Sequence, residues 1–308
     1  MPKPTPSAVH LAFASHADEV VNRLAATLCS DTFRGVIPAA EAEALAGATS
    51  MTVDELMLAL AKVAGAYAVA PVSRFFVGAV ARGGTGSLYL GSNLELSGEA
   101  LNLTVHAEQS AVTNAWIGGE ERIESIAVTA TPCGYCRQYL WELTSAQTLR
   151  VIVSDEAIPL WTLLPRAFGP RDLSVEGGLL TPQSHGLRIT GTTPEPIATA
   201  AALAAANRSY APYTKSYSGV AIITKSNIVA AAPYSENAAF NPSFSPACAA
   251  LSQLNLAGAA LSEIRAAILV EVENPPVSQL ALARAALASA AGVPVSIRYA
   301  IPPRGKSE

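Results

Sequence analysis

The chain has 308 residues, enough for about two domains at roughly 150 residues each. Hydrophobic side chains make up 50% of it and charged ones 14%, a balance that supplies sizeable cores and excludes a disordered chain. The formal net charge of −4 at pH 7 argues against a general attraction for nucleic acid, although a local basic patch would not show in the total.

Membrane insertion and export are not indicated. No stretch of the sequence has the roughly 20 consecutive apolar residues that cross a bilayer, and the alanine-rich run over 198–206 is far too short. The first ten residues, MPKPTPSAVH, are broken by prolines and lack the apolar centre of a signal peptide. We therefore expect a cytoplasmic protein that binds neither membrane nor nucleic acid.

The N-terminal part of the chain is predicted to be helical. Apolar side chains recur near helical spacing within residues 1–50. The next helix is predicted to begin at Thr52, because Glu55 follows three residues later in a capping-box pattern. It should end before Pro71, whose ring is incompatible with a helix interior.

Strands then alternate with helices. In chain order we predict a strand over 75–81, its hairpin partner over 87–91, a helix over 104–116, a strand over 123–130, a helix over 139–143 and a strand over 149–154. This alternation predicts an α/β fold in which helices pack on one mixed sheet.

A faint internal repeat relates the two halves of the chain. Ala70-Pro71 followed by Gly78-Ala79-Val80 recurs as Ala211-Pro212 followed by Gly219-Val220-Ala221, a shift of 141 residues (211 − 70). We therefore expect the second half to repeat the fold of the first.

The strongest signal for function is His106-Ala107-Glu108 followed by Pro132-Cys133-Gly134-Tyr135-Cys136. Both parts are predicted at helix starts, where free backbone N–H groups and a partial positive charge favour thiolates. One histidine and two cysteines provide three zinc ligands and leave a fourth tetrahedral position for water, as in catalytic zinc sites. Cys29 and Cys248 have no ligand spacing that would close the site.

The carboxylate two residues after the histidine suits hydrolysis. From the start of a helix, Glu108 can take a proton from water and return it to a substrate nitrogen. The order H-x-E…P-C-x-x-C is typical of zinc deaminases, in which zinc-activated hydroxide attacks C4 of cytosine and ammonia leaves. A CxxC alone would equally fit structural zinc or a redox pair, but neither explains His106 and Glu108.

The second half lacks this chemistry. Ser245-Pro246-Ala247 falls opposite His106-Ala107-Glu108, and Pro275-Pro276 falls opposite Pro132-Cys133. We therefore predict three regions. They are an N-terminal helical segment over 1–50, a catalytic zinc deaminase domain over 51–180 and a catalytically silent deaminase-like domain over 190–308.

Four runs of sequence resemble the homodimeric, two-domain cytidine deaminases of bacteria and plants. TVHAEQSAVTNAW (104–116) and TPCGYCRQ (131–138) look like the zinc motifs of that family, whereas LPRAFGPRDL (164–173) and ENAAFNPSF (236–244) resemble segments of its two-domain class. The resemblance covers nearly the whole chain. It implies a three-layer α/β/α cytidine deaminase fold, duplicated, with the second copy catalytically silent.

The resemblance also assigns the metal site and the proton shuttle. It implies one Zn²⁺ per chain, bound by His106, Cys133 and Cys136, with Glu108 moving protons. The implied reaction is hydrolytic deamination of cytidine and deoxycytidine to uridine and deoxyuridine, in pyrimidine salvage.

Contacts to a nucleoside substrate follow from the same resemblance. Asn93 and Glu95 match positions that hold ribose hydroxyls, a role that suits an amide and a carboxylate, and Phe75 matches the aromatic residue on the pyrimidine ring. Backbone groups of Ala107 and Thr131 are expected at the base edges. Without the resemblance, Phe75 would be interpreted as a core residue, and Asn93 and Glu95 as part of a polar turn.

Three further residues are implied to complete the site. Phe168 matches an aromatic residue near the site, although a packed loop anchor is the alternative. Ala239 and Phe240 lie in a segment that, in this family, reaches into the active site of the partner subunit. If so, a homodimer is required for activity.

Two other functions compete with this one. A deaminase acting on a base within DNA or RNA would use the same zinc chemistry, but with a basic channel and stacking aromatics. The negative net charge, the 6% of aromatic residues and the expected repulsion between Glu95 and phosphate argue against it. A non-catalytic zinc protein is disfavoured by the complete His-Glu-Cys-Cys set in the first half.

Overall fold

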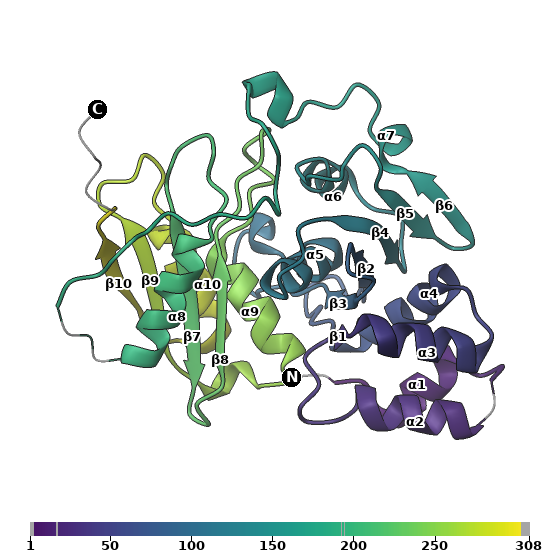
Figure 1. The fold of residues 1–308 in the computed structure, drawn as a ribbon. Helices are drawn as coiled ribbons and strands as arrows, with labels where there is room; N and C mark the ends of the chain where they lie inside the picture. Colours follow the sequence, from purple (N-terminus) through teal and green to yellow (C-terminus); the bar gives the residue numbers. More distant parts are fainter. Residues whose placement is uncertain (1–2, 17, 192, 194, 303–308) are drawn as a thin grey trace.

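The structure is a computed structural model that describes residues 3–16, 18–191, 193 and 195–302. Two mixed sheets are flanked by helices, one sheet in each half of the chain (Figure 1). The helices and strands of the first half are α1 (Pro6–Ala12), α2 (Asp18–Leu28), β1 (Val36–Ile37), α3 (Ala39–Thr49), α4 (Val53–Ala64), β2 (Gly78–Gly83), β3 (Leu88–Ser92), α5 (Ala107–Ile117), β4 (Ile123–Val128), α6 (Gly134–Leu140), β5 (Arg150–Val153), β6 (Glu156–Pro159) and α7 (Leu160–Leu163). Those of the second half are α8 (Pro196–Asn207), β7 (Ser218–Thr224), β8 (Val229–Pro233), α9 (Pro246–Leu256), β9 (Ile264–Val272), α10 (Leu280–Ala291) and β10 (Val295–Ala300).

The two sheets share a four-stranded part with the same topology, and the first sheet has β1 and β6 in addition. The first runs β1-β3-β2-β4-β5-β6 and the second runs β10-β9-β7-β8. In each, a hairpin (β2–β3 or β7–β8) pairs antiparallel with a third strand (β4 or β9), which in turn pairs parallel with a fourth (β5 or β10). The predicted duplication of an α/β fold is therefore confirmed.

Helices cover both faces of each sheet. In the first copy α4 packs on one face and α5 on the other, and in the second copy α8 and α9 take these places. Figure 1 shows α5 and α9 side by side between the two sheets, with α4 and α8 on the outer faces. Each copy is thus a three-layer α/β/α sandwich, and the copies face each other through their inner helices.

The largest hydrophobic core belongs to both copies at once. It includes Ala111 and Val112 of α5, Leu251 and Leu254 of α9, and apolar side chains from both sheets. Inside it, the Ser252 hydroxyl donates a hydrogen bond of 2.7 Å to the Ser110 hydroxyl. Burial of this shared apolar surface stabilises the two copies as one folding unit.

Glycines allow the close approach of helix and sheet at equivalent places. A Cβ on Gly78 would lie 2.0 Å from the carbonyl oxygen of Ala61 in α4, and one on Gly219 would lie 2.5 Å from the Ala206 nitrogen in α8. Both contacts are backbone, which cannot yield, so the positions require glycine. Their spacing of 141 residues (219 − 78) is that of the sequence repeat.

Three helices precede the first sandwich. α1, α2 and α3 pack around α4 over a separate core that includes Val9, Phe13 and Leu24, as predicted for a helical N-terminal segment. Among the described residues no single helix is long and apolar enough to cross a membrane, while one bent pair, Ala39–Thr49 with Val53–Tyr67, passes on length and composition alone. Residues 1, 2 and 17 of the predicted N-terminal segment, and 192, 194 and 303–308 of the predicted second domain, lie outside the described residues.

Most predicted elements of the first half are present with shifted ends. The capping box at the start of α4 is formed, with Glu55 accepting from the Thr52 nitrogen at 2.7 Å. The strand predicted over 75–81 begins only at Gly78, because the backbone of Phe75 and Val77 forms hydrogen bonds with the Asn93 side chain. The helical range predicted over 139–143 begins too late, whereas the helix start predicted at the zinc motif is present: α6 begins at Gly134, directly after Cys133 as its N-cap.

Candidate active site

A cavity of about 240 Å³ opens at the start of α5. It brings together eight of the residues expected from the sequence: Phe75, Asn93, Glu95, His106, Ala107, Glu108, Thr131 and Cys133. Ser73, Val77, Thr104 and Ala130 complete its lining. The site is therefore assembled from the loop before β2, the end of β3, the start of α5 and the segment that leads into α6.

Two helix starts bring the metal-binding groups together. His106 is the N-cap of α5 and Cys133 is the N-cap of α6, with Cys136 one turn further along α6. The imidazole Nδ1 of His106 and the two sulfur atoms all lie within 4.8 Å of one another. Within the described residues this is the only group of three or more His, Cys, Asp or Glu side chains arranged to hold a metal ion.

The spacing of these atoms fits tetrahedral zinc. Zn–S bonds of about 2.3 Å and Zn–N bonds of about 2.0 Å at tetrahedral angles place a sulfur and a nitrogen ligand about 3.6 Å apart. The Cys133 sulfur lies 3.7 Å from His106 Nδ1. The same separation therefore suits two ligands of one ion.

One of the two thiols readily loses its proton, and the other holds its proton more tightly. Hydrogen bonds from Cys136 and from His106 lower the pKa of the Cys133 thiol to about 3. The pKa of Cys136 is raised well above its ordinary value, first by its hydrogen bond to Cys133 and then by burial. The two thiols therefore hold one negative charge between them, and a divalent cation would stabilise the second thiolate.

Glu108 is buried at the floor of the cavity. It lies in the first turn of α5, and only 4% of its surface is exposed. Burial raises the pKa of this carboxyl, whereas hydrogen bonds and the neighbouring His106 oppose the rise. A buried carboxyl beside three metal-binding groups is suited to exchange protons with a bound water or substrate.

Glu95, which also lines the cavity, is held in place by the loop before β2. One carboxylate oxygen accepts from the backbone nitrogens of Val72 (2.8 Å) and Ser73 (3.0 Å), and the other accepts from the Ser73 hydroxyl. Burial alone would raise the pKa of Glu95, but these hydrogen bonds lower it, so the group is a carboxylate at neutral pH. The free lone pair of its second oxygen is available to a substrate hydroxyl.

Asn93 has two roles open to it. Its Oδ1 accepts from the Val77 nitrogen at 2.8 Å, and its Nδ2 donates to the Phe75 carbonyl at 2.9 Å. The side chain thus shapes the loop before β2 and retains one N–H for a ligand. Phe75, which this loop carries, is 60% exposed at the rim of the cavity and is not the core residue that its sequence alone suggested.

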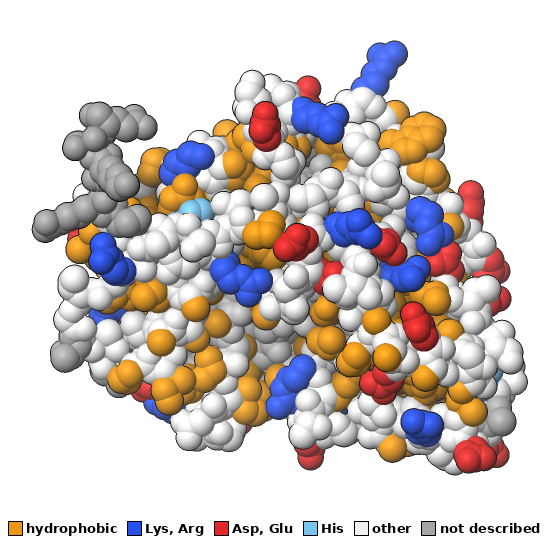
Figure 2. Space-filling view, in the orientation of Figure 1, with side chains coloured by type: hydrophobic (Ala, Val, Ile, Leu, Met, Phe, Trp, Pro, Cys, Tyr) orange, Lys and Arg blue, Asp and Glu red, His pale blue; other side chains and the backbone are white. Residues whose placement is uncertain are grey.

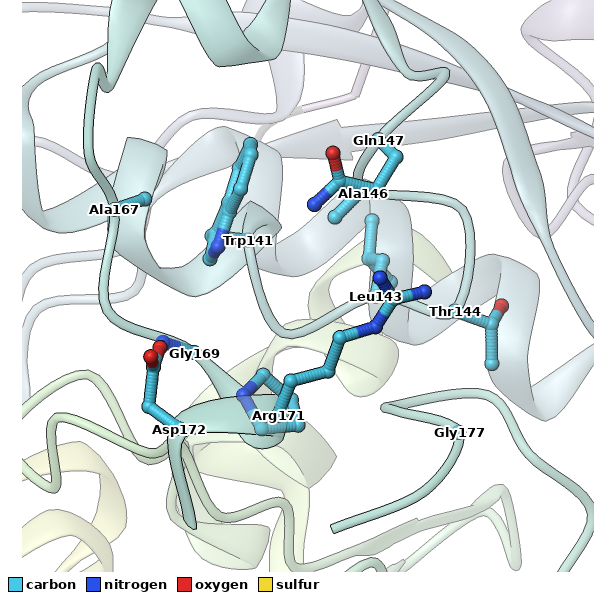
Figure 3. Close-up of a pocket in the computed structure, with 11 residues that line it drawn as sticks. Trp141, Leu143, Thr144, Ala146, Gln147, Ala167, Gly169, Arg171, Asp172 and Gly177 are labelled. Carbon is cyan, nitrogen blue, oxygen red and sulfur yellow. The ribbon is translucent and has the colours of Figure 1, made fainter. Parts of the chain in front are cut away.

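Besides Cys136, which belongs to the metal-binding group but does not line the cavity, three expected residues lie outside it. Phe168 sits in a loop whose neighbours Ala167 and Gly169 line a separate cavity of about 220 Å³, where the Trp141 ring stands beside them (Figure 3). Its carbonyl accepts from Gln138 Nε2 at 2.8 Å. Ala239 and Phe240 belong to the second copy, and Phe240 is 64% exposed.

Two residues of the site were not predicted from the sequence. Tyr135 stacks on the His106 ring with centroids 5.4 Å apart, and its hydroxyl donates to the Asn241 carbonyl of the second copy at 3.1 Å. Ser73 holds Glu95, as described above. Ser73 has a signal in the repeat, because Thr214 occupies its place in the second copy, whereas the contact of Tyr135 has none.

The chain is similar to known proteins along most of its length. Residues 51–153 and 160–284 each match the family described as the cytidine and deoxycytidylate deaminase zinc-binding region. A cytidine deaminase from Photobacterium profundum is 48% identical over 237 residues, which cover 77% of this chain and 79% of that protein. One from Aeromonas hydrophila is 42% identical over 282 residues, covering 91% and 96%.

Solved structures match a smaller part. The cytidine deaminase from Burkholderia pseudomallei is 33% identical and covers 37% of this chain and 97% of its own, with a TM-score of 0.34. With two matches to the family that together span most of the sequence, this chain belongs to the cytidine and deoxycytidylate deaminase family.

Proposed function

We propose that this chain hydrolyses cytidine and deoxycytidine to uridine and deoxyuridine, releasing ammonia. The observation that carries the proposal is a single cavity lined by two members of the metal-binding group, by the buried carboxyl of Glu108 and by the fixed carboxylate of Glu95. The metal-binding group with Glu108 suits hydrolysis of an amino group on a ring, and Glu95 suits sugar hydroxyls. The names of the curated relatives support the same reaction.

His106, Cys133 and Cys136 are proposed to hold one Zn²⁺ per chain, since their donor atoms and spacing fit that ion. When bound, zinc would supply a Lewis acid that makes water a nucleophile near neutral pH. Tyr135 supports the arrangement by packing on the His106 ring.

Glu108 is proposed as the proton shuttle. Its carboxylate takes a proton from the attacking water and delivers it to N3 of the cytosine ring. The water oxygen bonds to C4, and the proton of the resulting hydroxyl then passes through Glu108 to the exocyclic nitrogen, which leaves as ammonia when its bond to C4 breaks. Cytidine and water are thereby converted to uridine and ammonia, and Glu108 ends in its starting state.

The remaining lining residues are proposed to orient the nucleoside. Glu95 accepts a hydrogen bond from a ribose hydroxyl and Asn93 offers its free N–H to the sugar. Phe75 packs on the pyrimidine, and backbone groups of Ala107 and Thr131 bind the base edges. Holding the base against Glu108 in this way lowers the entropic cost of reaction.

We further propose a homodimer in which Phe168, Ala239 and Phe240 complete the site, the last two in the partner subunit. Support comes from the exposure of Phe240 on a turn with a left-handed backbone (φ 62°), a costly conformation for a large side chain. Phe240→Ala should lower cytidine turnover without dissociating the dimer, whereas Phe76→Ala, which removes an equally exposed ring, should not. Unchanged kinetics in Phe240→Ala would contradict the contact.

The domain limits and the cellular role are proposals of the same kind. We propose a helical segment over 1–50, a catalytic domain over 51–180 and a silent domain over 190–308, acting in pyrimidine salvage in the cytoplasm. Limited proteolysis with mass spectrometry tests the limits, because the first cuts should fall near residues 50 and 180–190. First cuts inside a sheet would contradict them.

The central test compares a free nucleoside with a polymer. On the face drawn in Figure 2, Lys and Arg side chains are interspersed with Asp and Glu, which supports a small substrate rather than a polynucleotide. Zinc-loaded protein is incubated with cytidine and, separately, with a cytosine-containing oligonucleotide, and loss of cytosine absorbance is followed. Turnover of cytidine alone is expected, and turnover of the oligonucleotide alone would overturn the proposal.

A further inference from the structure

The second copy contains a cavity at the place that corresponds to the active site. Its volume is about 290 Å³, and the residues that matter for its chemistry are Glu236, Ser245, Val277, Gln279 and Leu282. One further lining residue, Phe240, is the ring proposed above to reach the partner's active site, and the reaction uses none of the other five residues.

Two helix starts converge on this cavity, as they do on the active site. Ser245 is the N-cap of α9 and Gln279 is the N-cap of α10, and both line the cavity. In the first copy the N-caps of α5 and α6 are His106 and Cys133. The fold therefore presents hydroxyl and amide groups where the first copy presents metal ligands.

The carboxylate of the second cavity is held like Glu95. One oxygen of Glu236 accepts from the backbone nitrogens of Tyr213 (2.9 Å) and Thr214 (3.2 Å), and the other accepts from the Thr214 hydroxyl. As with Glu95, one lone pair of the second oxygen stays free for a ligand hydroxyl. The carboxylate of the sugar-binding half is thus retained, whereas Tyr234 takes the place of Asn93.

The reactive half has been replaced by a neutral polar floor. Ala247 takes the place of Glu108, and no second metal-binding group occurs within the described residues. Gln279 is 3% exposed, and its Oε1 has no hydrogen-bond partner in the described part of the chain. A buried acceptor without a partner is costly, and a ligand donor would satisfy it.

The polar floor matches the edge of a nucleobase. The Ser245 hydroxyl accepts from the Ala247 nitrogen and keeps its own proton to donate. The Ser245 donor and the Gln279 acceptor line the same cavity, and together they would complement an acceptor next to an N–H, as on uracil O4 and N3 or cytosine N3 and N4. Val277 and Leu282, 41% and 39% exposed, give the rim an apolar surface for the ring.

We propose that the second copy binds a free nucleoside in this cavity and does not turn it over. The assignment of the sugar end rests on the role proposed for Glu95, whose geometry Glu236 repeats. Each chain then carries two nucleoside sites, one that reacts and one that only binds.

The test counts bound nucleoside with uridine, which cannot be deaminated. Equilibrium dialysis of the zinc-loaded, assembled protein, up to about 1 mM uridine, should give two equivalents per chain. Glu95→Gln should remove the equivalent bound at the active site. Leu282→Trp, which fills the other cavity from its rim, should remove the second and leave one.

A second variant separates loss of binding from a packing defect in α10 caused by Leu282→Trp. Gln279→Met keeps the size of the side chain and removes the amide, and it should weaken the second site about tenfold or more, with zinc content and thermal midpoint as checks of folding. One equivalent in the unmodified protein, lost in Glu95→Gln and kept in both other variants, would overturn the proposal and leave Glu236 as a loop-forming residue.

Two separate measurements keep this proposal distinct from the reaction. Cytidine turnover tests the reaction alone: one equivalent of uridine with normal turnover overturns only the second site. Two equivalents without turnover support the second site and overturn the reaction. Adenosine offers the same acceptor and donor at N1 and N6 on a larger base, so it tests the size of the cavity, and binding of adenosine but not uridine would overturn the assignment of a pyrimidine.

Discussion

The two copies hold the same carboxylate in the same loop and differ in what faces it. In each loop one backbone nitrogen donates to the carbonyl of the residue four positions earlier. Arg74 donates to Ala70 in the first copy and Lys215 to Ala211 in the second, both at 3.0 Å. Arg74 and Lys215 also share a left-handed backbone, with φ of 55° and 60°. The loop is therefore a property of the fold and not of the reaction.

The helix starts, in contrast, have diverged completely. His106 and Cys133 meet in the first copy, whereas Ser245 and Gln279 take these places in the second. A helix start accepts any of these side chains, because its backbone N–H groups need a partner but not a particular one. The side chains at the helix starts therefore differ between the copies, while the loop that holds the carboxylate is the same in both.

The largest effect is expected from removing a metal ligand. Cys133→Ala should lose zinc and all measurable turnover, since two remaining ligands cannot hold a catalytic ion. Metal analysis by mass spectrometry measures the zinc. Cys248→Ala removes a buried thiol from the second copy and should retain one zinc per chain, whereas stoichiometric zinc in Cys133→Ala would show that the ligand set is wrong.

Next in size is the loss of the proton shuttle. Glu108→Ala gives the first copy the residue that the second carries at Ala247, and turnover should fall by about four orders of magnitude with zinc still bound. Glu108→Gln should be similarly inactive, because an amide keeps the shape but cannot transfer the proton. Loss of zinc from either variant would mean that Glu108 acts on the metal site instead.

A smaller effect is expected at the sugar end. Glu95→Gln should lower kcat/KM for cytidine by about 10- to 150-fold, since a hydrogen bond to a charged group contributes roughly 1.5–3 kcal/mol. Steady-state kinetics measure the change. Glu121→Gln removes the same charge from an exposed position and serves as the control. Equal effects of the two changes would indicate a general electrostatic cause.

The paired loop residues give the most direct comparison. Ser73→Ala and Thr214→Val each remove one hydroxyl donor to a glutamate, so each should cost about 1 kcal/mol of unfolding free energy. Only Ser73→Ala should raise KM for cytidine. Denaturant unfolding and kinetics on both variants provide the readouts, and a matching rise of KM in Thr214→Val would refute the separation of the two sites.

The smallest effect concerns Glu142, which the first copy inserts into the second. Its carboxylate accepts from the hydroxyls of Tyr210 and Tyr213 and from the Ala238 nitrogen at 2.8 Å. Burial raises its pKa above the ordinary value near 4.5, hydrogen bonds oppose the rise, and the nearby Glu236 adds to it.

A raised pKa means that the folded chain binds this proton more tightly than the unfolded chain does. Glu142 should therefore make stability fall as pH rises from about 4.5 through the folded pKa. Melting temperatures of wild type and Glu142→Gln over that range test this, and the slope should be flatter in the variant. Parallel curves would show that Glu142 does not contribute, with Glu121→Gln as the charge control.

Local chemistry explains what the sequence could predict. The capping box of Thr52 and Glu55 and the ligands His106, Cys133 and Cys136 act within a few residues of a helix start, so their pattern survives in the sequence. The repeat predicted the second fold because both copies keep their glycines and loops at one spacing.

Long-range packing explains what it could not. The contacts of Tyr135 with Asn241 and of Glu142 with Tyr210 depend on how α6 meets the second copy, which no periodicity records. The helical range predicted for α6 begins too late for a related reason. The first turn of α6 is held by Cys133 and by Arg137, which donates from Nε to the Pro132 carbonyl at 2.8 Å, and neither is a standard start signal.

The core shared by α5 and α9 has an evolutionary consequence. A duplicated domain that loses its chemistry is usually free to drift, but here its inner face packs directly behind the catalytic helix. Selection on the reaction would therefore still act on α9, and in this family we expect its buried positions to vary less than the exposed face of α8. The second copy would therefore change in sequence unevenly, slowly on the side that packs against the first copy and quickly on the side that faces water.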